Sequence, residues 1–274
     1  NSMPEIAEVE TVRNTLKSMI LNKKIVDVNI IYPKIIESDV KDFKDILTGR
    51  KFIDIDRIGK WLMFDLNDYY LLSHLRMEGK YFVKKSTDDI VKHEHIIISF
   101  EDGTDLRYHD TRKFGRMNLV KKIDIDKVGA IKKQGIEANS EKLTKEYLYE
   151  KIHKKNIPIK SLLLDQTIIS GLGNIYANEV MFDARINPSR LGKDISLNEC
   201  DLIVKASKKI IDAAIKDGGT TIKSYTSSLG VTGRFQQHLM VHKREGEECK
   251  VCGTIIENIK IGGRSTYFCP KCQK

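Results

Sequence analysis

Four cysteines near the end of the chain have the spacing of a metal site. Cys249 and Cys252 form one Cys-x-x-Cys pair, and Cys269 and Cys272 form a second pair after sixteen intervening residues. Each pair can place two thiolates on one edge of a tetrahedron, which is the geometry and the ligand type that Zn²⁺ prefers. Two disulfides or four unrelated thiols are the alternatives, but no secretory pattern supports disulfides. The spacing therefore predicts one structural zinc ion.

The residues between the two pairs predict a β-hairpin. Residues 254–261 alternate in polarity, Gly262 and Gly263 form a turn, and residues 264–268 return. A ribbon of about 25 residues is too small to hold a core without metal, so zinc would supply its folding energy. Arg264 stands at the hairpin tip, where its side chain can reach a partner outside the ribbon.

A second candidate site is the segment Gly171–Asn174, which precedes a predicted helix at 175–182. Glycines before a helix let an anion approach the backbone, and the free amides of the first turn can then bind a phosphate. Lys155 and Lys160, just upstream, could clamp the same strand. A plain turn between two helices explains a Gly-x-Gly sequence at least as well.

Two further segments place a large apolar side chain among charges, which suits a loop that inserts into a duplex. In Tyr108–Arg116 the apolar residue is Phe114, and in His74–Gly79 it is Met77. An ordinary strand end with a core Phe or Met is the alternative for each segment.

The hydrophobic pattern indicates which elements position these residues. Residues 5–20 have helical periodicity, and residues 24–120 contain short β-rich runs separated by turns, as in an antiparallel sandwich or flattened barrel. A charged stretch at 121–133 is expected to be a linker. Helical periodicity then returns in four segments: 142–153, 159–165, 175–182 and 197–216. The prediction is an α+β multidomain protein with a β-sandwich domain at 4–130, a helical domain at 131–244 and a zinc ribbon at 245–274.

Composition points to a polyanionic partner. The 274 residues include 47 Lys and Arg against 38 Asp and Glu, a net charge of +9, although lysines that only solvate the surface would give the same balance. No run of 18 apolar residues and no basic-then-apolar start occur, so we expect no membrane span and a cytoplasmic location. Cys200 is left over as an inert helical thiol.

Together with the N-terminus, these segments closely resemble the bacterial formamidopyrimidine-DNA glycosylase family. Members begin Met-Pro-Glu-Leu-Pro-Glu-Val-Glu-Thr-Val-Arg, and this chain reads Met-Pro-Glu-Ile-Ala-Glu-Val-Glu-Thr-Val-Arg at 3–13. The likeness covers essentially the whole chain and continues, in the family order, through Gly59-Lys60, His74–Met77, Asp110–Gly115, Ile159-Lys160, Gly171–Glu179, Phe235–Gln237, Arg244–Cys249 and Gly263–Cys269.

The resemblance implies an N-terminal β-sandwich, a helical domain with a helix-two-turn-helix, and a zinc ribbon. It also implies an activity on double-stranded DNA. Oxidised purines, namely 8-oxoguanine and ring-opened formamidopyrimidines, would be excised, and the strand would then be cut at the abasic site. By analogy we expect a monomer.

The resemblance makes Pro4 the nucleophile and Glu5 the proton shuttle. An α-amino group has a pKa of roughly 7.7–8.0 against about 10.4 for Lys, so about a tenth of it is neutral at pH 7. A secondary amine that attacks sugar C1′ yields an iminium, which is an electron sink for two successive phosphate eliminations. Lys60 would contact a phosphate near the flipped nucleotide and has a proposed acid role. Arg264 would support the second elimination.

The family also fills the hole left by the flipped base with three side chains, which match Met77, Arg112 and Phe114 here. Arg112 would face the widowed cytosine. The matching phosphate contacts are His93, Lys155, Lys160, Asn174 and Arg264. The matching lesion-capping loop contains Thr220, Thr221, Ile222, Lys223, Ser224 and Tyr225.

The chain departs from the family pattern at two places. Ala7 replaces the second proline, and we expect little functional loss from that change. Asn1 and Ser2 precede Met3 and look like residues left by an expression vector. With them attached, the Pro4 nitrogen is a tertiary amide and cannot attack, whereas removal of Met3 from the gene product would expose it.

Three other functions remain open at this point. The sister family acts on oxidised pyrimidines and shares the Pro-Glu start, although Met77, Arg112 and Phe114 favour the purine enzyme. A lesion-binding protein without catalysis would be the behaviour of a chain whose Pro4 is blocked. A zinc-ribbon transcription or RNA-binding protein would explain the cysteines and the charge but not the Pro-Glu start.

Overall fold

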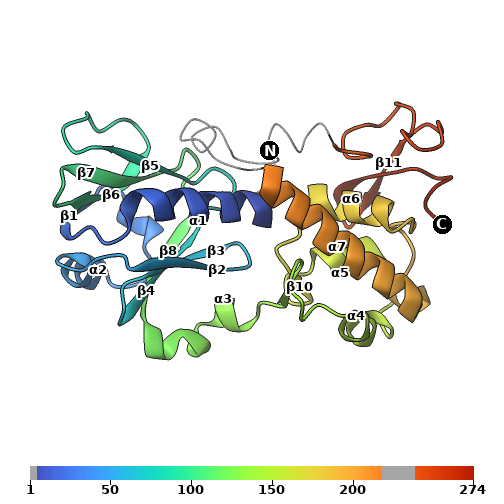
Figure 1. Cartoon of the computed structure of the whole chain (residues 1–274), viewed down its shortest axis with the longest axis horizontal. Coiled ribbons are helices and arrows are strands. Elements are labelled where there is room, and N and C mark those ends of the chain that lie inside the picture. The colour runs from blue at the N-terminus through green and yellow to red at the C-terminus, as the bar shows by residue number, and fades with distance from the viewer. Residues whose placement is uncertain (1–4, 218–237) are drawn as a thin grey trace. The chain divides into compact units, whose positions relative to one another are not determined.

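The computed structural model describes residues 5–217 and 238–274, which fall into two compact units (Figure 1). The first unit contains residues 8–132. The second contains residues 5–7, 133–217 and 238–274. Pro4 and the capping-loop residues 220–225 lie outside the described residues.

The first unit is built from two four-stranded antiparallel sheets. One sheet has the order β1 (Ile25–Ile30), β6 (Glu94–Phe100), β7 (Thr104–His109), β5 (Lys80–Lys85). The other has the order β2 (Asp54–Ile58), β3 (Trp61–Asp65), β4 (Tyr69–His74), β8 (Arg116–Lys121). Neighbouring strands in sequence are joined mostly by short turns, as the β-rich runs predict.

Helices α1 (Ile6–Ile20) and α2 (Val40–Leu47) share one apolar core with the two sheets. Leu16 of α1, Phe64 of β3 and Phe100 of β6 are all buried in this core. Period-2 alternation in the strands and period-3.6 repetition in α1 bring these side chains to one interior. The predicted helix followed by an antiparallel sandwich is confirmed.

The stretch expected to be a charged linker contains two short helices, η2 (Lys122–Lys127) and α3 (Gly129–Lys132). Apolar side chains of this stretch, including Val128 between the two helices and Ile131 of α3, pack against Trp61, Met63 and Leu72, which face away from the main core. The stretch leads to the boundary between the two units at 132/133, but it is folded along most of its length, because a few apolar residues among the charges cover the second face of the sheet.

The second unit is mainly helical, and its helices are close to the predicted segments. They are α4 (Lys145–Ile152), α5 (Ile159–Leu164), α6 (Asn174–Asp183), η3 (Gly192–Asp194) and α7 (Leu197–Asp217). Strands β9 (Ile136–Glu137) and β10 (Ile169–Ser170) form a short parallel pair. A buried apolar cluster joins α4 to α7, and it includes Ile6 and Ala7 from the start of α1.

The ribbon hairpin consists of β11 (Glu257–Ile261) and β12 (Arg264–Phe268), which pair antiparallel with Ile261 opposite Arg264. Gly262 and Gly263 form the turn with φ of 56° and 76°, the left-handed conformation that two-residue hairpins need. The hairpin is confirmed. Its separation from the helical part as a domain beginning at 245 stays a prediction.

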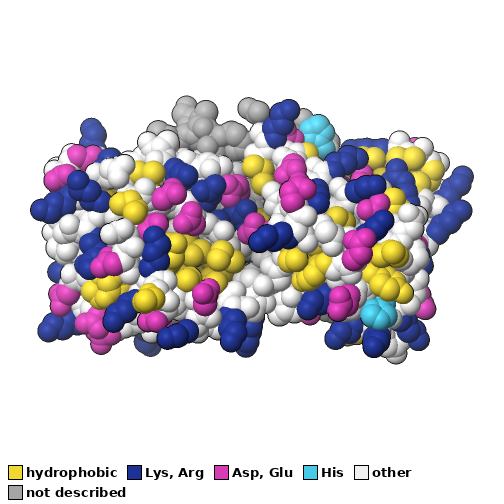
Figure 2. Space-filling model, turned by 60° about the horizontal axis from the view of Figure 1, so that its bottom comes forward, with side chains coloured by type: hydrophobic (Ala, Val, Ile, Leu, Met, Phe, Trp, Pro, Cys, Tyr) yellow, Lys and Arg dark blue, Asp and Glu magenta, His cyan; other side chains and the backbone are white. Residues whose placement is uncertain are grey.

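One face of the surface mixes both signs of charge. On the face drawn in Figure 2, Lys and Arg side chains are interspersed with Asp and Glu, so the excess of basic residues does not form a continuous basic area on that face. Among the described helices, none combines the length and the apolar character that crossing a bilayer requires.

Candidate functional site

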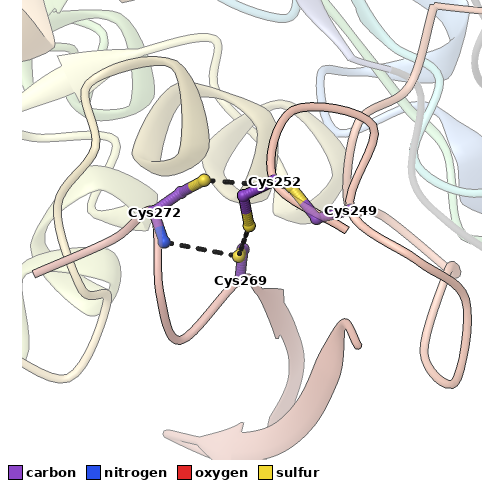
Figure 3. Close-up of side chains that lie close together, drawn as sticks. All are labelled: Cys249, Cys252, Cys269 and Cys272. Carbon is purple, nitrogen blue, oxygen red and sulfur yellow. Dashed lines mark hydrogen bonds between the residues drawn. The ribbon is translucent and has the colours of Figure 1, made fainter. Parts of the chain in front are cut away.

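The four predicted zinc ligands come together in the second unit (Figure 3). Their sulfur atoms all lie within 4.8 Å of one another. The Sγ–Sγ distance is 3.9 Å between Cys249 and Cys272 and 3.5 Å between Cys252 and Cys269. A tetrahedral zinc with bonds of about 2.3 Å separates its sulfur ligands by about 3.8 Å, so this cluster has the size of a zinc site.

Backbone amides support the thiolates from the loops that carry them. The amide of Val251 donates to Cys249 Sγ at 3.4 Å, and the amide of Cys272 donates to Cys269 Sγ at 3.3 Å. Such contacts orient ligands and stabilise their negative charge. Around the cysteines, Phe182 of α6 packs with Tyr267 of β12, so the metal site rests on α6.

Glu5 lies at the N-terminus of the same helix. Its side chain is 1 % exposed, and its Oε1 accepts a hydrogen bond of 3.2 Å from the amide of Ile175 in the first turn of α6. The adjacent amide of Ile6 donates to the carbonyl of Gly171 at 3.2 Å, which holds the backbone beside Glu5. First-turn amides and the helix dipole both stabilise a carboxylate at this position.

The glycine segment thus has an anion at its helix N-terminus, and that anion is the protein's own carboxylate. A Cβ on Gly173 would lie 2.2 Å from Glu5 Oε2, so residue 173 must be Gly for Glu5 to sit there. The sequence predicted an anion site at this turn but assigned it to a phosphate. A phosphate contact of Asn174 through its side chain stays a prediction.

Lys160 connects the start of α6 to the ribbon hairpin. Its side chain is fully buried, and Nζ donates to Asn174 Oδ1 at 2.6 Å, Thr266 Oγ1 at 2.7 Å and the Ser265 carbonyl at 3.0 Å. Burial, then the positive charges of Arg264 and Lys260, lower the pKa of Lys160 to about 7. Three acceptors nevertheless match the three donors of an ammonium group. Lys160 therefore positions Asn174 and the strand that begins with the exposed Arg264.

Glu179 is a site residue that the sequence reasoning missed. Its carboxylate accepts hydrogen bonds from the amides of Met240, Val241 and His242 at 2.6, 3.0 and 2.9 Å. Burial raises the pKa of Glu179, and the three amides oppose that rise. This contact ties α6 to the segment that leads into the ribbon. An acidic residue among the apolar residues of a buried helix was the available signal.

The three predicted wedge residues of the first unit lie together. Arg112 Nη1 is 3.6 Å from Met77 Sδ, and the guanidinium carbon of Arg112 is 4.9 Å from the centre of the Phe114 ring. Phe114 is 48 % exposed. An aromatic ring held at the surface by a cation is suited to stack on a base.

The other predicted DNA contacts occupy separate places. Lys60 is buried and directly precedes β3, His93 is half-buried beside His95 and His109, and Lys155 is exposed after α4. Their contacts with DNA remain predictions.

Three family models together match most of the chain. The formamidopyrimidine-DNA glycosylase N-terminal domain matches residues 3–117, the H2TH domain of the same enzymes matches 134–226, and a zinc finger found in FPG and IleRS matches 246–274. A formamidopyrimidine-DNA glycosylase of Halalkalibacterium halodurans is 44% identical over 274 residues, covering 99% of this chain and 100% of the relative. The chain belongs to the formamidopyrimidine-DNA glycosylase family. This is a family of DNA-repair enzymes.

Other members extend the comparison. The formamidopyrimidine-DNA glycosylase of Shouchella clausii is 45% identical over 273 residues, with 99% of both chains covered. A Lactococcus lactis FPG mutant, solved with DNA that contains Fapy-dG, matches with a TM-score of 0.91 and 38% identity over 99% of this chain and 100% of that one. A MutM complex with DNA containing carbocyclic 8-oxo-G matches with a TM-score of 0.90 and 37% identity over 99% and 100%.

The zinc-finger match and the cysteine geometry agree. The four cysteines are the ligands of one structural zinc ion. The fold expected from the family resemblance, a sandwich, a helix-two-turn-helix and a zinc ribbon, is confirmed.

Replacing Cys269 by Ser should remove the zinc and unfold the hairpin, because the metal supplies the folding energy of the ribbon. The helical core has its own buried cluster and should still unfold cooperatively. Metal analysis should fall from one zinc per chain to none, and duplex binding should be lost as Arg264 is displaced. Full DNA affinity in the zinc-free variant would contradict this prediction.

The matched control is Cys200→Ala. Cys200 is buried in α7, where burial, with a smaller effect from Glu199, raises the pKa of its thiol to about 12. This variant loses a cysteine without touching the cluster, so its zinc content and DNA affinity should stay unchanged.

Proposed function

We propose that this chain is a DNA glycosylase and abasic-site lyase that excises oxidised purines from double-stranded DNA. The observation that carries the proposal is the buried Glu5 carboxylate at the N-terminus of α6, directly after Pro4 in the chain. It is supported by relatives named formamidopyrimidine-DNA glycosylase and by similar structures that hold Fapy-dG or 8-oxo-G DNA. We expect the protein to act as a monomer on the chromosome, in the bacterial cytoplasm.

The proposed nucleophile is the Pro4 amine. Its nitrogen attacks C1′ of the damaged nucleotide and releases its proton to Glu5, the bond from C1′ to the base breaks, and the base leaves with a proton from water. Opening of the sugar ring then converts the new C–N bond into a cationic iminium. Loss of a proton from C2′ expels the 3′ phosphate, and a second elimination expels the 5′ phosphate. Water releases the sugar remnant and restores the amine.

Glu5 is the proposed proton shuttle. It would take the proton that the Pro4 amine releases on attack, pass that proton to the sugar ring oxygen as the ring opens, and later take the C2′ proton. The Ile175 amide holds one carboxylate oxygen and thereby sets the direction of the group. A side chain that is held in one direction can transfer protons without first losing conformational entropy.

The proposed DNA contacts use two kinds of side chain. Arg264 and Asn174 would bind phosphates beside the lesion, with Lys160 positioning both. Met77, Arg112 and Phe114 would fill the vacated stack, with Arg112 reading the opposite cytosine. Filling the stack matters because unstacking a base costs a few kcal/mol.

Glu5→Gln should keep lesion affinity within a few-fold and lose base excision by about 10²–10⁴, which is the usual contribution of a positioned acid or base. Glutamine keeps the acceptor for the Ile175 amide, so the fold at α6 should survive. The measurement is single-turnover excision of 8-oxoguanine from a duplex by a chain that begins at Pro4.

The control variant is Glu141→Gln, which removes a carboxylate whose side chain is 99% exposed. Its excision rate should equal that of the parent. Near-normal excision by Glu5→Gln would remove Glu5 from the mechanism.

The wedge assignment predicts different losses for different side chains. Phe114→Ala should weaken discrimination between lesion and undamaged duplexes, because the unstacking cost is no longer offset. Arg112→Ala should instead relax the preference for cytosine over adenine opposite the lesion. Titrations with both pairings at two salt concentrations measure these effects.

Lys155→Ala is the control for a plain phosphate contact. It should weaken binding to all duplexes alike and reduce the salt dependence by about one ion. If Arg112→Ala lowers affinity equally for both pairings, Arg112 contacts the backbone and the assignment of this loop is wrong.

A further inference from the structure

The wedge residues stand on two loops whose tips touch weakly. Met77 lies on residues 75–79, here the Met77 loop, and Arg112 and Phe114 lie on residues 110–115, here the Phe114 loop. The contact that joins the tips runs from Arg112 Nη1 to Met77 Sδ, a thioether acceptor, whereas the cation–π contact of Arg112 with Phe114 lies within the Phe114 loop. A hydrogen bond to a thioether at an exposed site is too weak to set the spacing of two loops. The spacing must be set at the buried bases of the loops.

One buried carboxylate shapes the Phe114 loop. Asp110 is fully buried, and its two oxygens accept hydrogen bonds from the amides of Arg112 at 3.1 Å, Lys113 at 2.9 Å and Gly115 at 2.9 Å. Lys113 has a φ of 59°, the left-handed conformation that is strained for a non-glycine residue. Asp110 therefore holds the strained backbone that presents Phe114.

The hydroxyl of Tyr108 is the fourth partner of this carboxylate. Tyr108 Oη donates a hydrogen bond of 2.8 Å to Asp110 Oδ2, and Tyr108 is only 1 % exposed. Burial, then the charge of Asp110, raises the pKa of the Tyr108 phenol. The phenol therefore stays protonated and remains a donor to the carboxylate.

The same hydroxyl lies against the backbone of both loops. A Cβ on Gly115, in the Phe114 loop, would lie 1.7 Å from Tyr108 Oη. A Cβ on Gly79, at the end of the Met77 loop, would lie 2.6 Å from the same oxygen. Both loops carry glycine at the point where they meet this atom, so both backbones pack closely on the Tyr108 hydroxyl.

A second tyrosine continues the contact toward the start of the Met77 loop. The Tyr81 ring lies 5.3 Å from the Tyr108 ring, centre to centre, and its hydroxyl lies 2.6 Å from Ser73 Oγ. Ser73 belongs to β4, which leads into the Met77 loop, and Tyr81 belongs to β5, which follows it. The two tyrosines therefore contact the strands on both sides of the Met77 loop and the base of the Phe114 loop.

We propose that Tyr108 and Asp110 are positioning residues that set the spacing between Met77 and the Arg112–Phe114 pair, and that they thereby determine how well the protein discriminates damaged from undamaged DNA. This inference rests on the proposed function, in which those three side chains fill the vacated stack. Loops that hold the three side chains in place before DNA binds reduce the entropy lost on binding.

The test is Tyr108→Phe, which removes the hydroxyl and keeps the ring. We expect the ratio of affinities for 8-oxoguanine and undamaged duplexes to fall about tenfold, the equivalent of one hydrogen bond to a charged group. Affinity for the undamaged duplex should stay within a few-fold. The control is Tyr147→Phe, which removes a hydroxyl that donates to the Ile168 carbonyl at 2.7 Å in the second unit. That variant should lose stability without any change in the ratio.

A double variant separates positioning from general weakening of the fold. If Tyr108 acts through Phe114, Tyr108→Phe should lower the ratio in the parent and have no further effect in a Phe114→Ala background. Thermal unfolding of each variant defines a temperature at which all of them are folded for the titrations. Equal losses in both backgrounds, or an unchanged ratio in Tyr108→Phe, would overturn the inference.

The parent and Phe114→Ala report on the proposed function itself. A parent that binds damaged and undamaged duplexes equally contradicts the proposed function, and the Tyr108 inference fails with it. If the parent discriminates and Phe114→Ala loses that discrimination, the proposed function stands. In that case the result for Tyr108→Phe decides the inference by itself.

Discussion

The contact between the Glu5 carboxylate and the first turn of α6 is the constraint on which the proposed chemistry depends. A buried carboxylate costs several kcal/mol unless hydrogen bonds or opposite charge compensate it, and here the Ile175 amide and the helix N-terminus do so. Gly173 leaves the space that Glu5 fills. Because Pro4 is bonded to Glu5, the same contact restrains the attachment point of the proposed nucleophile.

The ribbon is linked to this turn through Lys160, which joins Asn174 to the strand that begins with Arg264. The zinc ion thus stabilises a strand that contacts the start of α6.

In the first unit, regular strands carry loops whose conformation lowers the stability of the fold. Phe114 is 48 % exposed, and its loop includes the left-handed Lys113. Backbone strain lowers stability and is found most often at functional sites. The buried carboxylate of Asp110 and the packing around Tyr108 offset these costs. The proposed wedge therefore combines an exposed tip with a buried, hydrogen-bonded base.

The sequence predicted the features that depend on residues close together in the chain. Cysteine spacing predicted the zinc site, and periodicity predicted the sandwich, the hairpin and the main helices. Contacts between residues far apart in the chain left no such pattern. Nothing near Glu5 indicates that its carboxylate would occupy the helix N-terminus at Ile175, and Lys160 looked like a surface cation although it is buried. Met77, Arg112 and Phe114 were grouped through the family resemblance, since no spacing rule joins residues 35 positions apart. The roles of Pro4 and of residues 220–225 stay predictions.

Borohydride trapping on an 8-oxoguanine·cytosine duplex tests the central claim, that the Pro4 amine next to the buried Glu5 is the nucleophile. Borohydride reduces an iminium to a stable covalent cross-link, and peptide mapping then identifies the attached residue. A chain that begins at Pro4 should cross-link through Pro4. The chain with Asn1-Ser2-Met3 attached, its mass verified, should bind the lesion without cross-linking, because its Pro4 nitrogen is an amide. A cross-link through Lys60 or another lysine, or robust trapping by the longer chain, would contradict the account.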